Sequence, residues 1–400
     1  MTFTSKISYY LNLPENLFKL LISSVLFSVI SIQFLSFLTA ALTINHSIFF
    51  ILFLLSIAYT CSYFGYIHSC SYLSKKKYSH GFLLKTSSFF IALCCLLSSV
   101  LPNYLMPLLF LIGSFFSGFG WAERHYLEKI YSTSINKDIY LTLLQSFLSI
   151  LRIVIPLLLI LLTYLPITVN DKFLFNLSFF MLFLSFLFPK FPFKRIKNIS
   201  KISYKNILNL LKIQNKEYNK YYFLDGANNI LKQTLFVLGA MQTVKNINHY
   251  GLVESCASLL SGLMLFWLAK NHHISKIDVL SRFKISNYLL FISWLCLILS
   301  NYSSIFFFIF VITFSFGLPL NTAFKHSLML KIALKNDNSA FNLFLHRELI
   351  LWISRVVFLL SYSFIALFNP YPEYNISVFS FILILFIPLE YYYSLYILKK

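Results

Sequence analysis

Long apolar blocks alternate with short polar breaks over almost the whole sequence. Each block extends for about 20 residues, which is the length that a helix needs to cross a hydrocarbon layer of roughly 30 Å. We therefore predict that the blocks are membrane-spanning helices and that the chain is an all-α membrane protein with about twelve spans. The predicted spans cover residues 17–43, 47–70, 82–101, 104–122, 139–163, 172–189, 223–244, 251–269, 286–300, 303–324, 340–367 and 375–397.

Composition agrees with lipid as the solvent of these helices. Hydrophobic residues make up 58% of the 400 residues and charged residues only 12%, and 46 residues are phenylalanine. A soluble core could not bury so much apolar surface. The net charge of +20 does not indicate nucleic acid binding, because the sequence contains no soluble basic domain that would carry it.

Lysine and arginine indicate the orientation of the spans. When successive loops are assigned alternately to the two faces of the membrane, Lys172 and Lys245 fall on one face, and nearly all other members of the 33 fall on the face with both termini. Short cytoplasmic loops retain Lys and Arg, whereas translocated loops lack them. We therefore predict a multi-pass protein of the inner (plasma) membrane with both termini in the cytoplasm.

One cytoplasmic loop, residues 190–222, is longer than the others and is rich in Lys and Arg, with Glu217 as its one acidic residue. It divides the chain into a predicted six-helix bundle in residues 1–189 and a second in residues 223–400. Apolar residues recur in this loop at near-helical spacing, as expected of a basic amphipathic helix on the inner leaflet. A solvated tether between the two bundles explains the pattern equally well.

The two halves carry a weak internal repeat. A shift of 203 residues aligns the fifth span with the eleventh, so that Gln145 meets Glu348 and Arg152 meets Arg355. Basic residues are rare inside the spans, so the matched arginines favour a duplication.

This layout resembles the major facilitator superfamily, whose two six-helix halves are parallel repeats joined by a cytoplasmic loop. The segment HRELILWISRVV, residues 346–357, is similar to an RE-x6-R pattern in the eleventh span of some bacterial facilitators. The superfamily's signature loop between spans two and three would fall on residues 71–81, where Ser71 replaces its leading glycine and Lys75 its aspartate. The resemblance implies two parallel six-helix repeats in a divergent bacterial member.

Charged side chains inside the spans are candidates for function, because each costs roughly 2.5–3.5 kcal/mol on insertion scales and usually faces the protein interior. Glu348 and Arg355 lie two turns apart on one face of the eleventh span, too far apart to pair with each other. We predict that Arg355 contacts a substrate carboxylate or another anion and that Glu348 takes up a proton, each with a partner on a neighbouring helix. Alternatively, Arg152, Arg347, Glu348 and Arg355 form interhelical charge pairs that only hold the bundle together.

A polar stripe opens the seventh span, where Asp225, Asn228 or Asn229, and Lys232 recur at helical spacing. The first, fourth, seventh and tenth spans line the central cavity in the superfamily. The resemblance therefore implies that this stripe, together with Gln33 of the first span, contacts substrate, and it makes Asp225 the second protonation candidate. Alternatively, Asp225 caps the helix N-terminus and Lys232 reaches back to the cytoplasm.

We expect simpler roles for the other charged residues near the span ends. Glu390 of the last span is expected to be solvated, and Glu123 and Arg124 are expected to pair at the membrane surface. Pro156 is expected to free a backbone carbonyl that the Arg152 guanidinium could bind.

Motifs for other kinds of chemistry are missing from the sequence. GxxxxGK[ST], HExxH and GxSxG do not occur, and His272 and His273 have no third metal ligand nearby. The chain is therefore not predicted to be an enzyme or to bind a metal or a cofactor.

Together these features predict a secondary active transporter of a small anionic or zwitterionic organic solute, working by alternating access and coupled to protons. Four cations inside the spans against few acids favour an anionic cargo. Two alternatives stay open: a lipid-linked saccharide flippase or exporter, and a non-transporting membrane subunit. We expect a monomer in contact with membrane lipids, with a membrane partner subunit left open.

Overall fold

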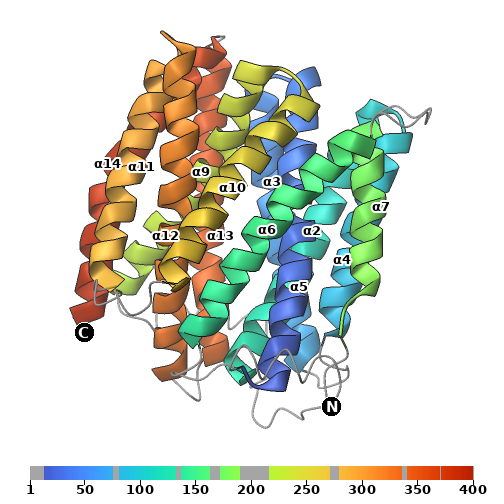
Figure 1. The fold of residues 1–400 in the computed structure, drawn as a ribbon, viewed down its shortest axis with the longest axis vertical. Coiled ribbons are helices and arrows are strands. Elements are labelled where there is room, and N and C mark those ends of the chain that lie inside the picture. The colour runs from blue at the N-terminus through green and yellow to red at the C-terminus, as the bar shows by residue number, and fades with distance from the viewer. Residues whose placement is uncertain are drawn as a thin grey trace.

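Twelve α-helices, running up and down between two ends of the molecule, build the described part of the chain in a computed structural model (Figure 1). The structure describes residues 13–74, 81–131, 137–162, 172–189, 216–270, 279–335, 340–369 and 371–399. The helices are α2 (Glu15–Asn45), α3 (Ile48–Ser74), α4 (Phe82–Val100), α5 (Met106–Tyr131), α6 (Lys137–Leu162), α7 (Lys172–Phe186), α9 (Lys216–Val244), α10 (Ile247–Lys270), α11 (Val279–Leu299), α12 (Ser304–Lys335), α13 (Ala340–Phe368) and α14 (Pro372–Lys399). A short 3-10 helix, η1 (Asn103–Leu105), precedes α5.

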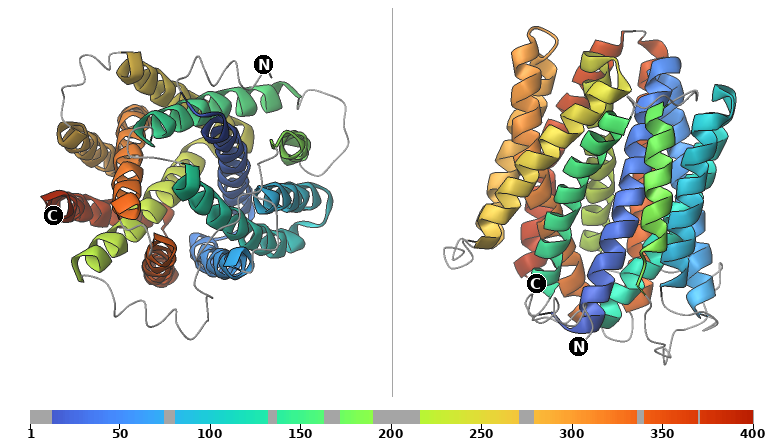
Figure 2. Two further views of the ribbon diagram at one scale, coloured as in Figure 1. Left: turned by 90° about the horizontal axis from the view of Figure 1, so that it is seen from below. Right: turned by 45° about the vertical axis from the view of Figure 1, so that its right-hand side comes forward.

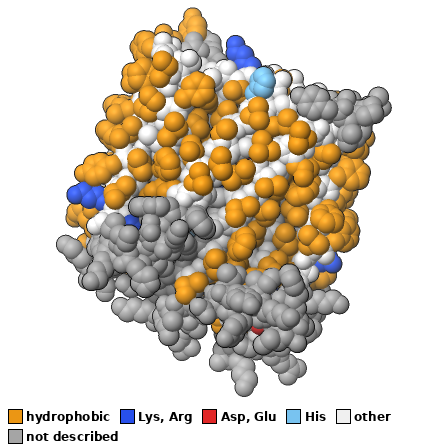
Figure 3. All heavy atoms as spheres, in the orientation of Figure 1, with side chains coloured by type: hydrophobic (Ala, Val, Ile, Leu, Met, Phe, Trp, Pro, Cys, Tyr) orange, Lys and Arg blue, Asp and Glu red, His pale blue; other side chains and the backbone are white. Residues whose placement is uncertain are grey.

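Each predicted span coincides with one of these helices. Among the described residues, nine helices are long and apolar enough to cross a membrane, and α7 contributes a shorter apolar segment, Phe173–Phe186. Hydrophobic side chains cover most of the described face in Figure 3, as expected for a surface in contact with lipid. The prediction of an all-α membrane protein is confirmed.

Helix ends depart from the predicted spans wherever charges lie. α5 continues to Tyr131, α12 continues to Lys335, and α9 begins at Lys216. A hydropathy reading stops at a charge, whereas a helix continues as long as its backbone hydrogen bonds and packing persist. Residues 216–222, which we assigned to the linker, therefore belong to α9. The amphipathic helix considered for the linker lies outside the described residues.

Both termini lie at one end of the helices. α2 begins and α14 ends at the lower end of the molecule in Figure 1, which we call the terminal end, and we call the opposite end the far end. Viewed from below, the helices surround a central region (Figure 2). Helices before and after residue 200 touch mainly where α6 packs against α10 and where α3 packs against α13.

Two glycines bring α3 and α5 into backbone contact. A Cβ on Gly118 would lie 1.8 Å from the carbonyl oxygen of Ser62, and one on Gly65 would lie 2.0 Å from the carbonyl oxygen of Phe115. Membrane helices approach this closely where small residues meet at the crossing. Any larger side chain at Gly65 or Gly118 would push the two helices apart.

Candidate functional site

A cavity of about 360 Å³ lies between the helices of the two sequence halves. Helices α2, α3, α5 and α6 line it from one half, and α9, α10, α12 and α13 line it from the other. This volume is in the range of sites that bind small organic molecules, roughly 300–1,000 Å³. The charged and histidine side chains in its lining are Arg124, His125, Arg152, Asp225, Lys325, His326, Arg347, Glu348 and Arg355.

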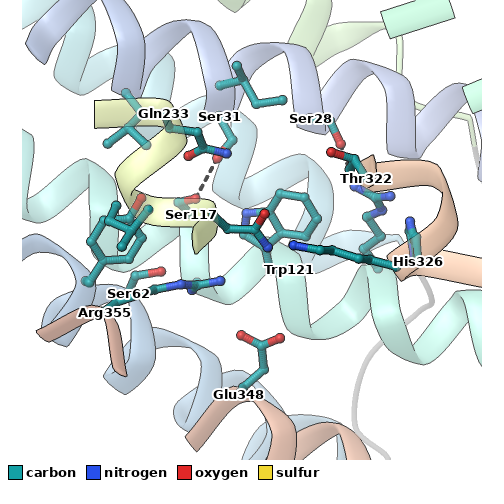
Figure 4. Close-up of a pocket in the computed structure, with 18 of the residues that line it drawn as sticks. Ser28, Ser31, Ser62, Ser117, Trp121, Gln233, Thr322, His326, Glu348 and Arg355 are labelled. Carbon is teal, nitrogen blue, oxygen red and sulfur yellow. Dashed lines mark hydrogen bonds between the residues drawn. The ribbon is translucent and has the colours of Figure 1, made fainter. Parts of the chain in front are cut away.

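The α13 side chains behave partly as predicted. Glu348 and Arg355 both line the cavity, and Figure 4 shows their side chains pointing from α13 into the open space. The guanidinium of Arg355 lies 5.3 Å from the ring centroid of Tyr59 on α3, and no ion pair joins it to a described carboxylate. The cation beside Glu348 is its sequence neighbour Arg347, whose Nη1 lies 2.7 Å from Glu348 Oε1. The expectation of a partner for Glu348 on another helix was therefore wrong.

The polar stripe of α9 divides between two faces. Asp225 and Asn229 line the cavity, and Asn229 Nδ2 donates a hydrogen bond to Asp225 Oδ1 at 2.8 Å. Asn228 and Lys232 are fully buried outside the cavity lining, as is Gln33 on α2. Asn228 is three positions after Asp225 and so lies about 60° around the helix from it, whereas Lys232, seven positions after Asp225, lies nearly in line with it and is buried in contact with Glu390 and Asn321.

The α9 residues also join a group of charges that spans α9, α12, α13 and α14. We call it the lysine cluster, and its members are Asp225, Asn228, Lys232, Asn321, Lys325, Arg347 and Glu390. Lys325 of α12 forms ion pairs with Glu390 and with Asp225, at 3.0 Å from the latter. Lys232 Nζ lies 3.8 Å from Glu390 Oε2 and donates a hydrogen bond to Asn321 Oδ1 at 3.2 Å. The remaining contacts of the cluster are Asn228 Nδ2 to Glu390 Oε2 at 2.6 Å and Arg347 Nη2 to Asp225 Oδ2 at 3.6 Å.

The lysine cluster corrects three expectations. Asp225 does not cap a helix, because α9 begins at Lys216, well before it. Lys232 does not reach the cytoplasm, and Glu390 is fully buried instead of solvated. All three side chains stay inside because each finds an oppositely charged partner there, which offsets the cost of desolvation.

The expected surface pair of Glu123 and Arg124 on α5 does not form. Both side chains are buried, and they point to different partners. Glu123 accepts hydrogen bonds from the backbone N–H groups of Gly81 and Leu84, each at 2.7 Å, and so holds the N-terminus of α4. A carboxylate is favoured there because the first N–H groups of a helix have no partner within the helix.

Arg124 instead belongs to a contact between α5 and α12. Its Nε lies 2.9 Å from Glu128 Oε1, while His326 Nε2 of α12 lies 3.3 Å from Glu128 Oε2. Tyr140 of α6 also donates a hydrogen bond to Glu128, at 3.0 Å. These contacts connect the two sequence halves near the terminal end.

Arg152 and Glu254 form a further charge pair, farther from the terminal end, where α6, α10 and α2 meet. Arg152 donates hydrogen bonds from Nε and Nη2 to Glu254 Oε1, at 3.2 Å and 3.0 Å. Gln33 Nε2 lies 3.4 Å from the same oxygen. The Arg152 guanidinium thus binds a carboxylate of α10 and not the carbonyl that Pro156 frees in α6.

Several of these partners were missed in the sequence. Lys325 and Glu128 lie just beyond the predicted ends of their spans, so they were read as loop residues. Glu254 lies inside the predicted span 251–269, where an isolated carboxylate is itself a signal. The expectation that cations outnumber acids inside the spans was wrong. The missed residues include the carboxylates Glu128 and Glu254 as well as the cation Lys325, so acids are not rare inside the helices.

A second, smaller cavity of about 110 Å³ continues the first toward the far end. Arg152, Gln233 and Tyr59 line both cavities. The rest of the smaller lining is largely apolar and includes Phe236 and Phe314. Arg152 therefore lies where the polar cavity passes into an apolar one.

Metal ligands were not expected, and the described residues contain no group of three or more His, Cys, Asp or Glu side chains that could hold a metal ion. His272 and His273 lie outside the described residues.

Comparison with known proteins identifies the fold. No protein-family model and no curated protein matches the sequence. The crystal structure of the nucleoside transporter NupG aligns with 97% of this chain and 100% of its own, with a TM-score of 0.60 and 12% identity. The chain has the major facilitator fold. This confirms the fold that the sequence layout predicted.

Two further structures give the same fold. A mutant of NupG covers 96% of this chain and 99% of its own, with a TM-score of 0.65 and 13% identity. An auto-inhibited peptide transporter of the POT family covers 96% of both chains, with a TM-score of 0.62 and 9% identity. In this major facilitator fold α2, α5, α9 and α12 are the first, fourth, seventh and tenth spans, and all four line the cavity described above.

Proposed function

We propose that the chain is a secondary active transporter that moves a small anionic or zwitterionic organic solute by alternating access, coupled to protons. We place it in the inner membrane with the terminal end in the cytoplasm, on the basis of the Lys and Arg distribution. Solved structures of the same fold include a nucleoside transporter and a peptide transporter, which supports a small organic cargo.

One observation carries the anionic part of the proposal, namely the charge balance inside the helices. Five interior cations each pair with a carboxylate: Arg124, Arg152, Lys232, Lys325 and Arg347. Arg355 is the cation of the described cavity lining that has no carboxylate partner. A cation held in a partly desolvated site without a counter-ion is costly, and an anionic group of the cargo would remove that cost.

The rest of the lining supports an organic cargo with both apolar and hydrogen-bonding parts. Trp121, Trp352 and Tyr59 contribute aromatic side chains to the lining, while Gln145 and Gln233 contribute amide groups. Sites for small molecules typically combine such an apolar lining with a few polar groups that fix orientation. Asp225, Asn229 and Glu348 would add acceptors for a cationic group if the cargo is zwitterionic.

Alternating access requires two units that move relative to each other. We propose residues 1–189 and 223–400 as these units, joined by the basic linker, with the cavity between them. Contacts between the two units concentrate at α6–α10 and at α3–α13, which leaves two interfaces along which they could rock. A single copy contains the complete cavity lining, which supports a monomer.

The cavity volume of about 360 Å³ favours a small solute over the lipid-linked saccharide of the flippase alternative. The coupling roles predicted for Glu348 and Asp225 stay predictions. Both carboxylates line the cavity, and both already have cations beside them.

Uptake into proteoliposomes tests the proposal. Purified full-length protein would be reconstituted, a proton gradient imposed, and the accumulation of four labelled probes compared: benzoate, phenylalanine, uridine and choline. We expect benzoate or phenylalanine to accumulate, because each carries a carboxylate for Arg355, and choline to be excluded. Collapse of the gradient with an ionophore should abolish accumulation.

Arg355→Gln should abolish accumulation of the carboxylate probe, and Arg282→Gln on α11, outside the cavity lining, serves as the matched control. Accumulation of choline, or failure of the wild type to bind or move any carboxylate or zwitterion, would contradict the proposal.

A further inference from the structure

We propose that Glu254 is the coupling carboxylate: its protonation releases Arg152, which then binds an anionic group of the cargo. This inference rests on the proposed function, because it assigns the proton-binding residue of the same transport cycle. Glu254 is neither of the two coupling candidates that the sequence indicated, Glu348 and Asp225.

The geometry of the pair is asymmetric. Both hydrogen bonds from Arg152 end on Glu254 Oε1, and Gln33 Nε2 approaches the same oxygen. Glu254 Oε2 is buried and receives no hydrogen bond from Arg152 or Gln33. The Glu254 side chain is 1% exposed, whereas that of Arg152 is 29% exposed and lines both cavities. The carboxylate is thus sealed in the protein while its cation faces the transport path.

The surroundings of Glu254 contain few other titratable groups. Tyr250, one turn earlier on α10, interacts electrostatically with both Glu254 and Arg152. From α2 the polar neighbour is Gln33, and beside Arg152 the helices α9 and α12 contribute Gln233 and Ser315 to the smaller cavity, neither of which titrates. Arg152 is therefore the cation on which the charge of Glu254 depends.

Three other buried carboxylates each have more than one cationic or imidazole partner, and Glu123 is held by backbone N–H groups of α4 outside the cavity lining. Asp225 has Lys325, Arg347 and Asn229 beside it. Glu390 has Lys325, Lys232 and Asn228. Glu128 has Arg124, His326 and Tyr140. If one partner of any of these moved away, at least one other would stay in place.

Glu254 would have no cation left if Arg152 turned to a cargo anion. A buried carboxylate that loses its cation is strongly destabilised as an anion, so it takes up a proton and becomes a neutral carboxylic acid. In the balanced step, one proton from solution binds one carboxylate oxygen of Glu254. Arg152 keeps its positive charge, and the cargo carboxylate replaces Glu254 as its counter-ion.

Coupling follows from this exchange. The cargo anion binds Arg152 more tightly when Glu254 is protonated, and by linkage Glu254 binds a proton more tightly when the cargo is present. An empty cavity favours the Arg152–Glu254 pair and a deprotonated carboxylate. Cargo and proton therefore bind together and leave together, as coupled transport in one direction requires.

Infrared difference spectroscopy on the full-length protein in lipid nanodiscs tests the assignment. Spectra would be recorded on acidification in the presence of benzoate, together with proton uptake from a weakly buffered solution when benzoate is added. For the wild type we expect a carboxylic-acid C=O band from a buried site and proton uptake when benzoate binds. Glu254→Gln should lose both signals and still bind benzoate without pH dependence.

Two further variants separate Glu254 from the rival candidate and from misfolding. Glu348→Gln removes the rival carboxylate of the cavity lining, so if Glu254 is the coupling residue this variant should retain the band and the proton uptake. Glu254→Asp should retain a band at a shifted frequency, which shows that a carboxyl group at this position is responsible even if Glu254→Gln folds poorly.

Persistence of the buried-acid band in Glu254→Gln, or its loss in Glu348→Gln, would overturn the assignment. The infrared titration reports protonation of Glu254 whether or not benzoate is bound. Failure of the proposed function would instead appear as the absence of any carboxylate binding or uptake by the wild type.

Discussion

Arg152 on α6 and Arg355 on α13 occupy matching positions in the internal repeat, yet their surroundings differ. The helix that packs against α6 offers Arg152 a carboxylate, Glu254, at 3.0 Å. The helix that packs against α13 offers Arg355 the ring of Tyr59 at 5.3 Å. Both guanidinium groups line the same cavity.

The difference teaches that a duplicated residue acquires its role from its partner. A cation with a carboxylate beside it is neutralised and becomes available only when that carboxylate is protonated. A cation with an aromatic ring beside it keeps most of its charge and can bind an anion at any time. Under the proposed cycle, Arg355 would be a permanent anion site and Arg152 a conditional one.

The largest expected effect is on the stability of the protein when the Arg152–Glu254 ion pair is broken. Arg152→Gln leaves Glu254 buried without a cation, so we expect it to lower the free energy of unfolding by about 3–5 kcal/mol. The double variant Arg152→Gln with Glu254→Gln should recover most of that loss, since it removes the unpaired charge. Denaturant unfolding of the two single variants, the double variant and the wild type in detergent measures the coupling between them. Equal stability of Arg152→Gln and wild type would remove the contrast with Arg355.

The second effect concerns the binding of a carboxylate at Arg355. Arg355→Gln should weaken carboxylate binding by ~1.5–3 kcal/mol, on the order of 10- to 100-fold, because a charge-assisted hydrogen bond is lost. It should leave stability close to wild type, since no described carboxylate forms an ion pair with Arg355. Isothermal titration calorimetry with benzoate checks the affinity, with Arg355→Lys as the conservative control. Unchanged affinity in Arg355→Gln would show that the cargo anion binds elsewhere.

The smallest effect concerns the ring beside Arg355. Tyr59→Leu should lower the free energy of unfolding by about 0.5–1 kcal/mol through loss of the cation–π contact, and Tyr59→Phe should cost less because the ring face remains. Thermal unfolding of both variants gives the comparison. A loss as large as that of Arg152→Gln would mean that Tyr59 and Glu254 are equivalent partners, contrary to the distinction drawn here.

The fold could be predicted from the sequence because the signal for membrane helices is local. Twenty apolar residues in a row specify a span whatever its neighbours are, and all twelve predicted spans coincide with helices. Helix ends were harder to predict, since the predicted spans stopped just before Glu123 and Lys325, which remain helical and buried.

The site was only partly predictable, because an ion pair depends on residues far apart in sequence. Arg355, Glu348 and Asp225 were recognised as unusual charges, and the structure places all three in the cavity lining. Their partners could not be inferred: Lys325 is 100 positions from Asp225 and Glu254 is 102 positions from Arg152. Which face each charge occupies, and which opposite charge meets it, depends on how the helices are arranged around one another.

The backbone contact between α3 and α5 at Gly65 and Gly118 limits where motion can occur. Two helices whose main chains touch cannot slide past each other, so α3 and α5 would travel as one rigid body during the proposed rocking. Across the interface, α3 meets α13 through side chains, where the Tyr63 ring stacks on Trp352 at 4.7 Å. Trp352 Nε1 also donates a hydrogen bond to Thr60 Oγ1 of α3 at 3.3 Å, so the proposed rocking would have to break this contact between α3 and α13 while α3 and α5 move together.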